Sequence, residues 1–149
     1  MSQKDEQLFG LQLVVERNLL DSLESYFEDT DVLWDCSQCS QSVVCKRSLA
    51  VIELPNVLLL HLKRFRSTGS RVVKITFRCE FPMTNLDFQG QLYNLTSVIN
   101  HHGSVSSGHY TAFVCANNQW FLCDDEKVSP IDSLSVVTPD AYILTYKLL

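Results

Sequence analysis

In the stretch GHYTAFVCANNQWFLCDD, residues 108–125, two apolar runs flank a pair of asparagines. Asparagine tolerates the positive φ that tight hairpin turns need, so this stretch predicts a β-hairpin that turns at the Asn-Asn pair. A loop of two or four residues centred on that pair sets Thr111 opposite Asp124, and His109 opposite Glu126. The hairpin therefore predicts which side chains share a face of the sheet.

The predicted register brings an imidazole and a carboxylate together near the open end of the hairpin. His109 and Asp124 become diagonal neighbours on one face, roughly 7–8 Å apart and within side-chain reach, while Asp125 points to the other face. A carboxylate that accepts from one imidazole nitrogen leaves the other nitrogen free to take a proton from a nucleophile. We therefore expect His109 to be a base that Asp124 orients, with Gly108 leaving the approach open. A loop of odd length would exchange the two aspartates, and a surface histidine beside acidic turn residues is the alternative interpretation.

Outward from the hairpin, the chain predicts further strands and one short helix near its start. Asn18 resembles an N-cap, and the apolar residues that follow it, as far as Phe27, are spaced to form one helical face. The apolar run at 57–62 is too short for a normal helix, which favours a buried strand. The other predicted strands are 11–15, 43–52, 72–77, 93–100, 110–115, 119–123 and 141–146, with a turn at 67–70. No repeat or linker interrupts them, so residues 1–149 are expected to form one α+β unit that is mostly antiparallel sheet.

The composition predicts a packed globule with a mild negative charge. Hydrophobic residues make up 46% of the chain and charged residues 19%, which excludes a disordered chain. The net charge is −5, from 12 basic and 17 acidic residues, which argues against a nucleic-acid partner and suits a basic protein better. No apolar run approaches the roughly 18 residues of a membrane helix, and residues 1–7 are too polar for a secretory signal. We expect an intracellular protein of the cytoplasm, the nucleus or both, with no membrane partner.

Five blocks of the sequence, in order, resemble the ubiquitin-specific protease family, the papain-like ubiquitin carboxyl-terminal hydrolases. The most specific is GHYTAF at 108–113, which looks like the histidine box of that family. The other four are LPNVLLLHLKRF at 54–65, YNLTSVINHHG at 93–103, WFLCDD at 120–125 and AYILTY at 141–146. Together they cover nearly the whole chain, from Phe9 to Lys147. The resemblance implies the C-terminal half of a catalytic domain, namely its palm and part of its fingers.

The resemblance also implies the activity and the roles of individual residues. The chain would supply the His-Asp half of a cysteine-type deubiquitinase, which removes ubiquitin from protein conjugates and requires no cofactor. In that site His109 would be the general base, Asp124 its orienting residue and Asp125 a neighbouring hydrogen-bonding or oxyanion-supporting residue. The implied partners are ubiquitin, ubiquitinated proteins and the missing N-terminal half of the domain. The residues expected to bind substrate, beside the channel for the Gly-Gly tail of ubiquitin, are His101, Gly103, Gly108 and Tyr110.

Other residues of these blocks are not expected to contact substrate. The side chain of His102 is expected to face solvent in a loop, and residues 63–65 to form a structural strand end. A bracing role in the loop is also open for His101.

The sequence departs from the family pattern at the nucleophile, because it lacks the upstream cysteine box. A reactive cysteine needs a helix N-terminus or cationic surroundings that lower its pKa. The four scattered cysteines lie instead in strand-like, mostly apolar surroundings, so we expect buried structural thiols at Cys45, Cys79, Cys115 and Cys123. An inactive relative that binds ubiquitin or regulates a protease is therefore the alternative function, and a plain β-rich domain is a third.

A second departure concerns zinc. Cys36 and Cys39 form a C-x-x-C that resembles the second cysteine pair of the family's fingers, where two such pairs hold one zinc ion. The first pair would lie upstream of Met1, so zinc binding requires cysteines supplied from there. Cys45 as a third ligand and free thiols near a loop both stay open.

Overall fold

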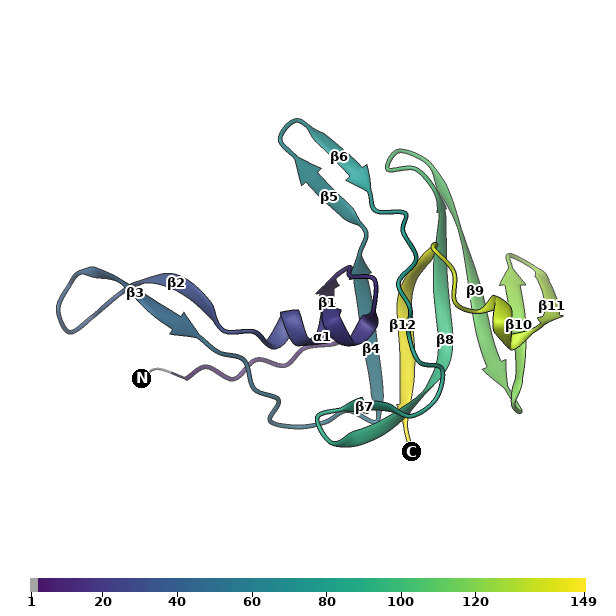
Figure 1. Cartoon of the computed structure of the whole chain (residues 1–149), viewed down its shortest axis with the longest axis horizontal. Coiled ribbons are helices and arrows are strands. Elements are labelled where there is room, and N and C mark those ends of the chain that lie inside the picture. Colours follow the sequence, from purple (N-terminus) through teal and green to yellow (C-terminus); the bar gives the residue numbers. More distant parts are fainter. Residues whose placement is uncertain (1–2) are drawn as a thin grey trace.

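The computed structural model describes residues 3–149, which form one large sheet with two hairpins that project from it (Figure 1). The elements in chain order are β1 (Leu11–Val14), α1 (Leu19–Phe27), β2 (Thr30–Asp35), β3 (Ser42–Arg47), β4 (Val57–Lys63), β5 (Phe65–Thr68), β6 (Arg71–Lys74), β7 (Leu86–Phe88), β8 (Gln91–Gly103), β9 (Gly108–Ala116), β10 (Gln119–Asp124), β11 (Lys127–Ile131), η1 (Ser133–Ser135) and β12 (Ala141–Leu148). None of the helices between residues 3 and 149 is long and apolar enough to cross a membrane.

The large sheet has eight strands in the order β1-β4-β12-β8-β9-β10-β11, with β7 paired to β8. Only β1 and β4 run parallel within this sheet, with Leu11 opposite Leu60, and the other pairs are antiparallel. The last strand, β12, lies between β4 and β8, so the C-terminal segment of the chain is an interior strand of the sheet. The predicted α+β fold, mostly antiparallel sheet with a short helix near the start, is confirmed.

One face of the sheet carries the core. In β4, Leu58, Leu60 and Leu62 are buried while the alternate residues face outward, so the apolar run is buried on one face and not on both. α1 covers this face with Leu19 and Leu23, and the predicted cap is present because the Asn18 side chain accepts from the Leu20 amide at 2.9 Å. Each such leucine, when fully buried, stabilises the fold by about 1.5–3 kcal/mol.

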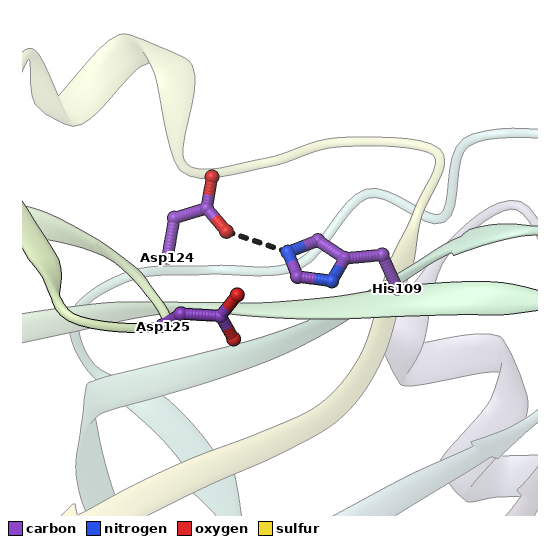
Figure 2. Close-up of side chains that lie close together, drawn as sticks. All are labelled: His109, Asp124 and Asp125. Atoms are coloured by element: carbon purple, nitrogen blue, oxygen red, sulfur yellow. Dashed lines mark hydrogen bonds and ion pairs between the residues drawn. The ribbon is translucent and has the colours of Figure 1, made fainter.

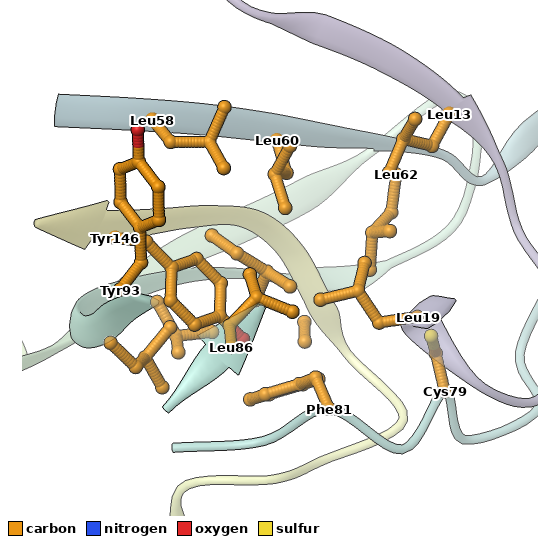
Figure 3. Close-up of a cluster of buried hydrophobic side chains, with 14 of the residues drawn as sticks. Leu13, Leu19, Leu58, Leu60, Leu62, Cys79, Phe81, Leu86, Tyr93 and Tyr146 are labelled. Carbon is orange, nitrogen blue, oxygen red and sulfur yellow. The ribbon is translucent and has the colours of Figure 1, made fainter. Parts of the chain in front are cut away.

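The core also contains two fully buried tyrosines, Tyr93 and Tyr146, which lie beside Leu58 and Leu86 (Figure 3). Their hydroxyls donate to main-chain carbonyls, Tyr93 to Pro55 at 2.8 Å and Tyr146 to Pro82 at 2.7 Å. A buried hydroxyl needs such a partner, so these two bonds hold the segments at Pro55 and Pro82 against the core.

The hairpins β2–β3 and β5–β6 extend away from the sheet in different directions (Figure 1). The predicted strand at 43–52 ends earlier, at Arg47, because its partner β2 begins at the paired residue Thr30 and offers no further backbone groups. The predicted strand at 72–77 ends at Lys74 because the chain turns inward, where the Ile75 amide donates to the Arg64 carbonyl at 2.7 Å.

Two further differences concern short edge elements. The predicted turn at 67–70 is confined to Gly69 and Ser70, since β5 continues to Thr68. The strands β2, β5, β7 and β11 were not among the predicted strands, because each is short. β11 contains Pro130 and forms the edge of the sheet, where a missing amide donor is tolerated.

Candidate active site

The hairpin β9–β10 has the register that the sequence predicts. Asn117 and Asn118 both have positive φ, 49° and 61°, as the favoured two-residue hairpin turn requires. Residue Trp120 pairs with Cys115, and Cys123 pairs with Ala112. The pairing ends there, and the same register carried one residue further sets Thr111 opposite Asp124, as predicted.

The register places His109 and Asp124 on the same face, in direct contact. His109 Nε2 lies 2.5 Å from Asp124 Oδ1, so the expected meeting of these two side chains is confirmed (Figure 2). The hydrogen bond to Asp124 is the main cause that raises the pKa of His109 above its ordinary value; partial desolvation opposes the shift, and the charges of both aspartates add to it. Within residues 3–149, His109 Nδ1 makes no hydrogen bond. The imidazole is therefore oriented through one nitrogen and open at the other.

Two details of the prediction beyond Asp124 are wrong. β10 ends at Asp124, which pairs with Lys127, so the chain turns at Asp125 and Glu126 and Glu126 does not lie opposite His109. Asp125 takes a positive φ of 50° in this turn, which directs its carboxylate toward the site and not to the other face (Figure 2). One side-chain ligand atom each from His109, Asp124 and Asp125 lies within 4.8 Å of the others. The predicted roles of all three residues in catalysis stay predictions.

The loop before His109 is closed by two glycines that pair with each other, Gly103 and Gly108. A Cβ on Gly103, which has a φ of 103°, would lie 2.6 Å from the Ser107 carbonyl oxygen. A Cβ on Gly108 would collide with the ring of His101. Neither position therefore accepts a side chain without a shift of the loop.

His101 and Tyr110 form an aromatic contact on the face opposite His109. Their ring centroids lie 4.8 Å apart, and His101 also packs against Phe65 at 5.3 Å. His101 is 5% exposed, which suits the bracing role, whereas Tyr110 is 54% exposed. Substrate contacts by His101, Gly103, Gly108 and Tyr110 stay predictions.

The loop position predicted for His102 is wrong. His102 lies in β8, directly opposite His109, where its ring bonds to Asp140 and Thr111 while its side chain stays 43% exposed. The alternation of a strand could have predicted this position. If the strand predicted from residue 93 continues to 103, His102 lies on the same face as the buried Asn100. The structural role expected for residues 63–65 is confirmed at Arg64, which is fully buried and bonds to main-chain carbonyls.

The C-x-x-C motif lies at the tip of β2–β3. Two backbone bonds close the tip: the Cys36 amide donates to the Gln41 carbonyl, and the Ser40 amide donates to the Cys36 carbonyl. Ser40 adopts a φ of 56°. Backbone N–H groups of Cys39 and Gln38, together with the Cys39 side chain, lower the pKa of the Cys36 thiol. Over residues 3–149, the only group of three or more candidate metal ligands is the one at His109, so neither Cys45 nor any other residue completes a site here. The two thiols alone do not fit the tetrahedral zinc site that the motif implies.

The other cysteines differ from one another in burial. Cys79 is fully buried, and burial raises the pKa of its thiol to about 11. Cys45, Cys115 and Cys123 are half-buried, so the expectation of buried thiols is correct for Cys79 only. Among the residues that the structure describes, no cysteine sulfur makes a hydrogen bond to His109.

Comparison with known proteins places the chain in a family. The sequence profile described as "Ubiquitin carboxyl-terminal hydrolase" matches residues 16–146. The chain belongs to the ubiquitin carboxyl-terminal hydrolase family. It is similar to ubiquitin carboxyl-terminal hydrolase 2 of Gallus gallus, with 34% identity over 147 residues that cover 89% of this chain and 41% of the relative. It is also similar to hydrolase 5 of Arabidopsis thaliana, with 35% identity over 129 residues, 78% of this chain and 14% of that protein.

Solved structures of a hydrolase-containing complex share the fold. The SAGA DUB module of Ubp8, Sgf11, Sus1 and Sgf73 bound to monoubiquitin matches with a TM-score of 0.84 and 29% identity, over 95% of this chain and 35% of the matched one. A yeast SAGA DUB module with an Sgf73 mutant matches with a TM-score of 0.86 and 28% identity, over the same shares. This ubiquitin carboxyl-terminal hydrolase chain thus spans less than half the length of these relatives.

Proposed function

We propose that this chain supplies the His-Asp half of a cysteine-type deubiquitinase site, which removes ubiquitin from protein conjugates. The observation that carries the proposal is the contact of His109 Nε2 with Asp124 at 2.5 Å, which leaves Nδ1 open. Family membership supplies the reaction class, and the hairpin supplies the base and its orienting carboxylate. The nucleophilic cysteine would come from a segment outside these 149 residues, so residues 1–149 act as one unit within a larger catalytic domain.

The proposed chemistry begins with the tautomer of His109. Asp124 accepts from Nε2–H, so the neutral ring presents a lone pair at Nδ1 and takes the proton of the incoming thiol. The thiolate attacks the isopeptide carbonyl carbon, and the C–N bond breaks as His109 returns the proton to the lysine amine. Water then attacks the thioester, with His109 as the base, and the thiol leaves. Asp125 would support this site from the turn beside it.

The proposed partners follow from the same site. The tail of ubiquitin would pass beside the loop between Gly103 and Gly108, and one of the similar solved structures is described as bound to monoubiquitin. Thiol chemistry of this kind requires no cofactor. Zinc would bind at Cys36 and Cys39 only if a further cysteine pair joined them. We place the protein inside the cell, in the cytoplasm, the nucleus or both.

A chimera tests the proposed function. Residues 1–149 replace the matching stretch of the Gallus gallus relative, so that the upstream part of the relative provides the cysteine box. We expect this chimera to release a fluorophore from the C-terminus of ubiquitin, and we expect His109→Gln to abolish the release. His61→Gln is the matched control, because His61 lies in β4 on the outer face and meets Tyr142 edge-on, with ring centroids 4.6 Å apart. A chimera that binds ubiquitin and cleaves none of it would favour the inactive, ubiquitin-binding alternative.

The isolated chain provides the complementary test. Ubiquitin with a C-terminal electrophile should not form a covalent adduct with residues 1–149 alone. An adduct on any of the six cysteines would show that a local thiol acts as the nucleophile, which would overturn the division of labour proposed here.

A further inference from the structure

The strand that leads to the site, β8, is longer than the strand beside it. β12 begins at Ala141, opposite Asn100, and the His101 amide makes the last main-chain bond across this edge, to the Asp140 carbonyl at 2.9 Å. Beyond that point, the carbonyls of His101 and Gly103 have no strand to pair with on this side. Unpaired backbone carbonyls away from water are costly, so another donor is needed there.

The ammonium group of Lys74 provides that donor. Lys74 is the last residue of β6, and its Nζ lies 2.5 Å from the His101 carbonyl oxygen, 3.1 Å from that of Gly103 and 3.4 Å from Asp140 Oδ1. An ammonium group has three protons to donate, and these three acceptors match them. The side chain is only 7% exposed, so this charge is held within the protein and not on its surface.

Asp140 connects this lysine to the strand of the candidate base. Its second oxygen lies 3.1 Å from His102 Nδ1, and His102 Nε2 lies 2.9 Å from Thr111 Oγ1. His102 is the cross-strand partner of His109, and Thr111 follows His109 by two residues on the same face of β9. A chain of hydrogen bonds therefore runs from Lys74 through Asp140 and His102 to Thr111. It ends on β9, two residues from His109 and on the same face of the sheet.

We propose that Lys74, Asp140 and His102 are positioning residues for His109. Lys74 replaces the missing strand at the end of β8, and His102 ties that end to β9. Together they hold the start of β9 where Nε2 of His109 meets Asp124. The catalytic meaning of this arrangement rests on the proposed function, but the arrangement itself is a property of residues 1–149 and is measurable without a nucleophile.

Two NMR measurements on the 149-residue chain test the proposal, with Lys74→Met as the main variant. Methionine keeps the length and the apolar stem of lysine and removes the donors. We expect the pKa of His109 to fall by about half a unit or more, as its contact with Asp124 loosens. Loss of a positive charge alone would raise this pKa, so the sign separates position from charge. We also expect amide exchange at His101 to rise by about tenfold or more.

Three further variants complete the experiment. Lys74→Arg keeps donors at this site and should restore most of the His109 pKa. Lys46→Met is the matched control, because Lys46 pairs with Asp31 on the exposed β2–β3 hairpin and should leave the pKa of His109 unchanged. If Lys74→Met does not fold, Thr111→Val removes the bond from His102 to β9 without changing any charge, and it should produce the same fall.

An unchanged or higher pKa of His109 in folded Lys74→Met or Thr111→Val overturns the proposal, whatever the exchange rates show. An inactive chimera would instead contradict the proposed function. The titration of His109 in the 149-residue chain would still test the positioning roles.

Discussion

Two regions carry chemically active residues at a fixed spacing: the open end of the β9–β10 hairpin and the tip of the β2–β3 hairpin. Only in the first do these residues form the contact that the motif predicts. His109 and Asp124 belong to one hairpin, so its register alone brings them to 2.5 Å. Cys36 and Cys39 also share a hairpin, but a tetrahedral zinc site needs two more ligands than this tip provides. A motif therefore forms a site when the register of one hairpin brings all of its residues together. It forms only part of a site when further ligands must come from another segment.

The largest expected effect separates the two regions by activity. In the chimera, His109→Ala should lower kcat/KM on the order of 10³-fold, because the general base is lost. The double variant Cys36→Ser, Cys39→Ser should change the same constant by less than about threefold, because these thiols lie outside the site. Fluorogenic ubiquitin hydrolysis measures both. An equally severe loss in the cysteine variant would end the distinction drawn between the regions.

The reactivity of the thiols gives the next largest effect. At pH 7, iodoacetamide should modify Cys36 on the order of 10²-fold faster than Cys79, because the thiolate is the reactive form. Backbone N–H groups lower the pKa of Cys36, whereas burial raises that of Cys79 to about 11. Mass spectrometry of a timed reaction resolves the two sites. Equal rates for both would contradict the environments described for these cysteines.

The two aspartates beside His109 should differ in their effect on it. Asp124→Ala should lower the pKa of His109 by about one unit, and Asp125→Ala by only about a few tenths, since the hydrogen bond is made by Asp124. The same shift makes stability depend on pH. The pKa of His109 is raised by folding, so the contact stabilises the fold fully below the unfolded value and loses this contribution as pH rises through the folded value. The destabilisation caused by Asp124→Ala in urea melts should therefore shrink from pH 5.5 to pH 8.5. A destabilisation that grew over this range would contradict the raised pKa.

The smallest effect is expected for metal removal. A chelator should shift the Tm of the 149-residue chain by less than about 1 °C, since structural zinc adds large folding free energies only where the full ligand set is present. Differential scanning calorimetry with and without EDTA gives the answer. A fall of several degrees, absent in the Cys36→Ser, Cys39→Ser variant, would show that the tip does hold a metal ion.

How much of this could be predicted from the sequence depended on how local the interaction is. The turn at Asn117 and Asn118 fixed the register over several residues, so the contact of His109 with Asp124 followed from it. The direction of Asp125 did not follow, because it depends on where β10 ends and on a positive φ that the alternating pattern does not encode.

Long-range contacts were also out of reach of sequence reasoning. The position of Lys74 depends on a β12 that starts opposite Asn100, three residues short of the end of β8, and nothing near Lys74 in sequence signals this. His102 was misplaced for the same reason, since its partner Asp140 lies far along the chain. The family resemblance did not supply these contacts either, because it gave the roles of motif residues and no distances.

The tautomer of the neutral His109 ring provides the sharpest check of the proposed site. Two-dimensional ¹⁵N NMR of the imidazole at a pH above its pKa distinguishes a proton on Nε2 from one on Nδ1. We expect the Nε2–H form, bonded to Asp124, together with a pKa above the ordinary value of 6.5. A neutral ring protonated at Nδ1, with a pKa at or below that value, would contradict it.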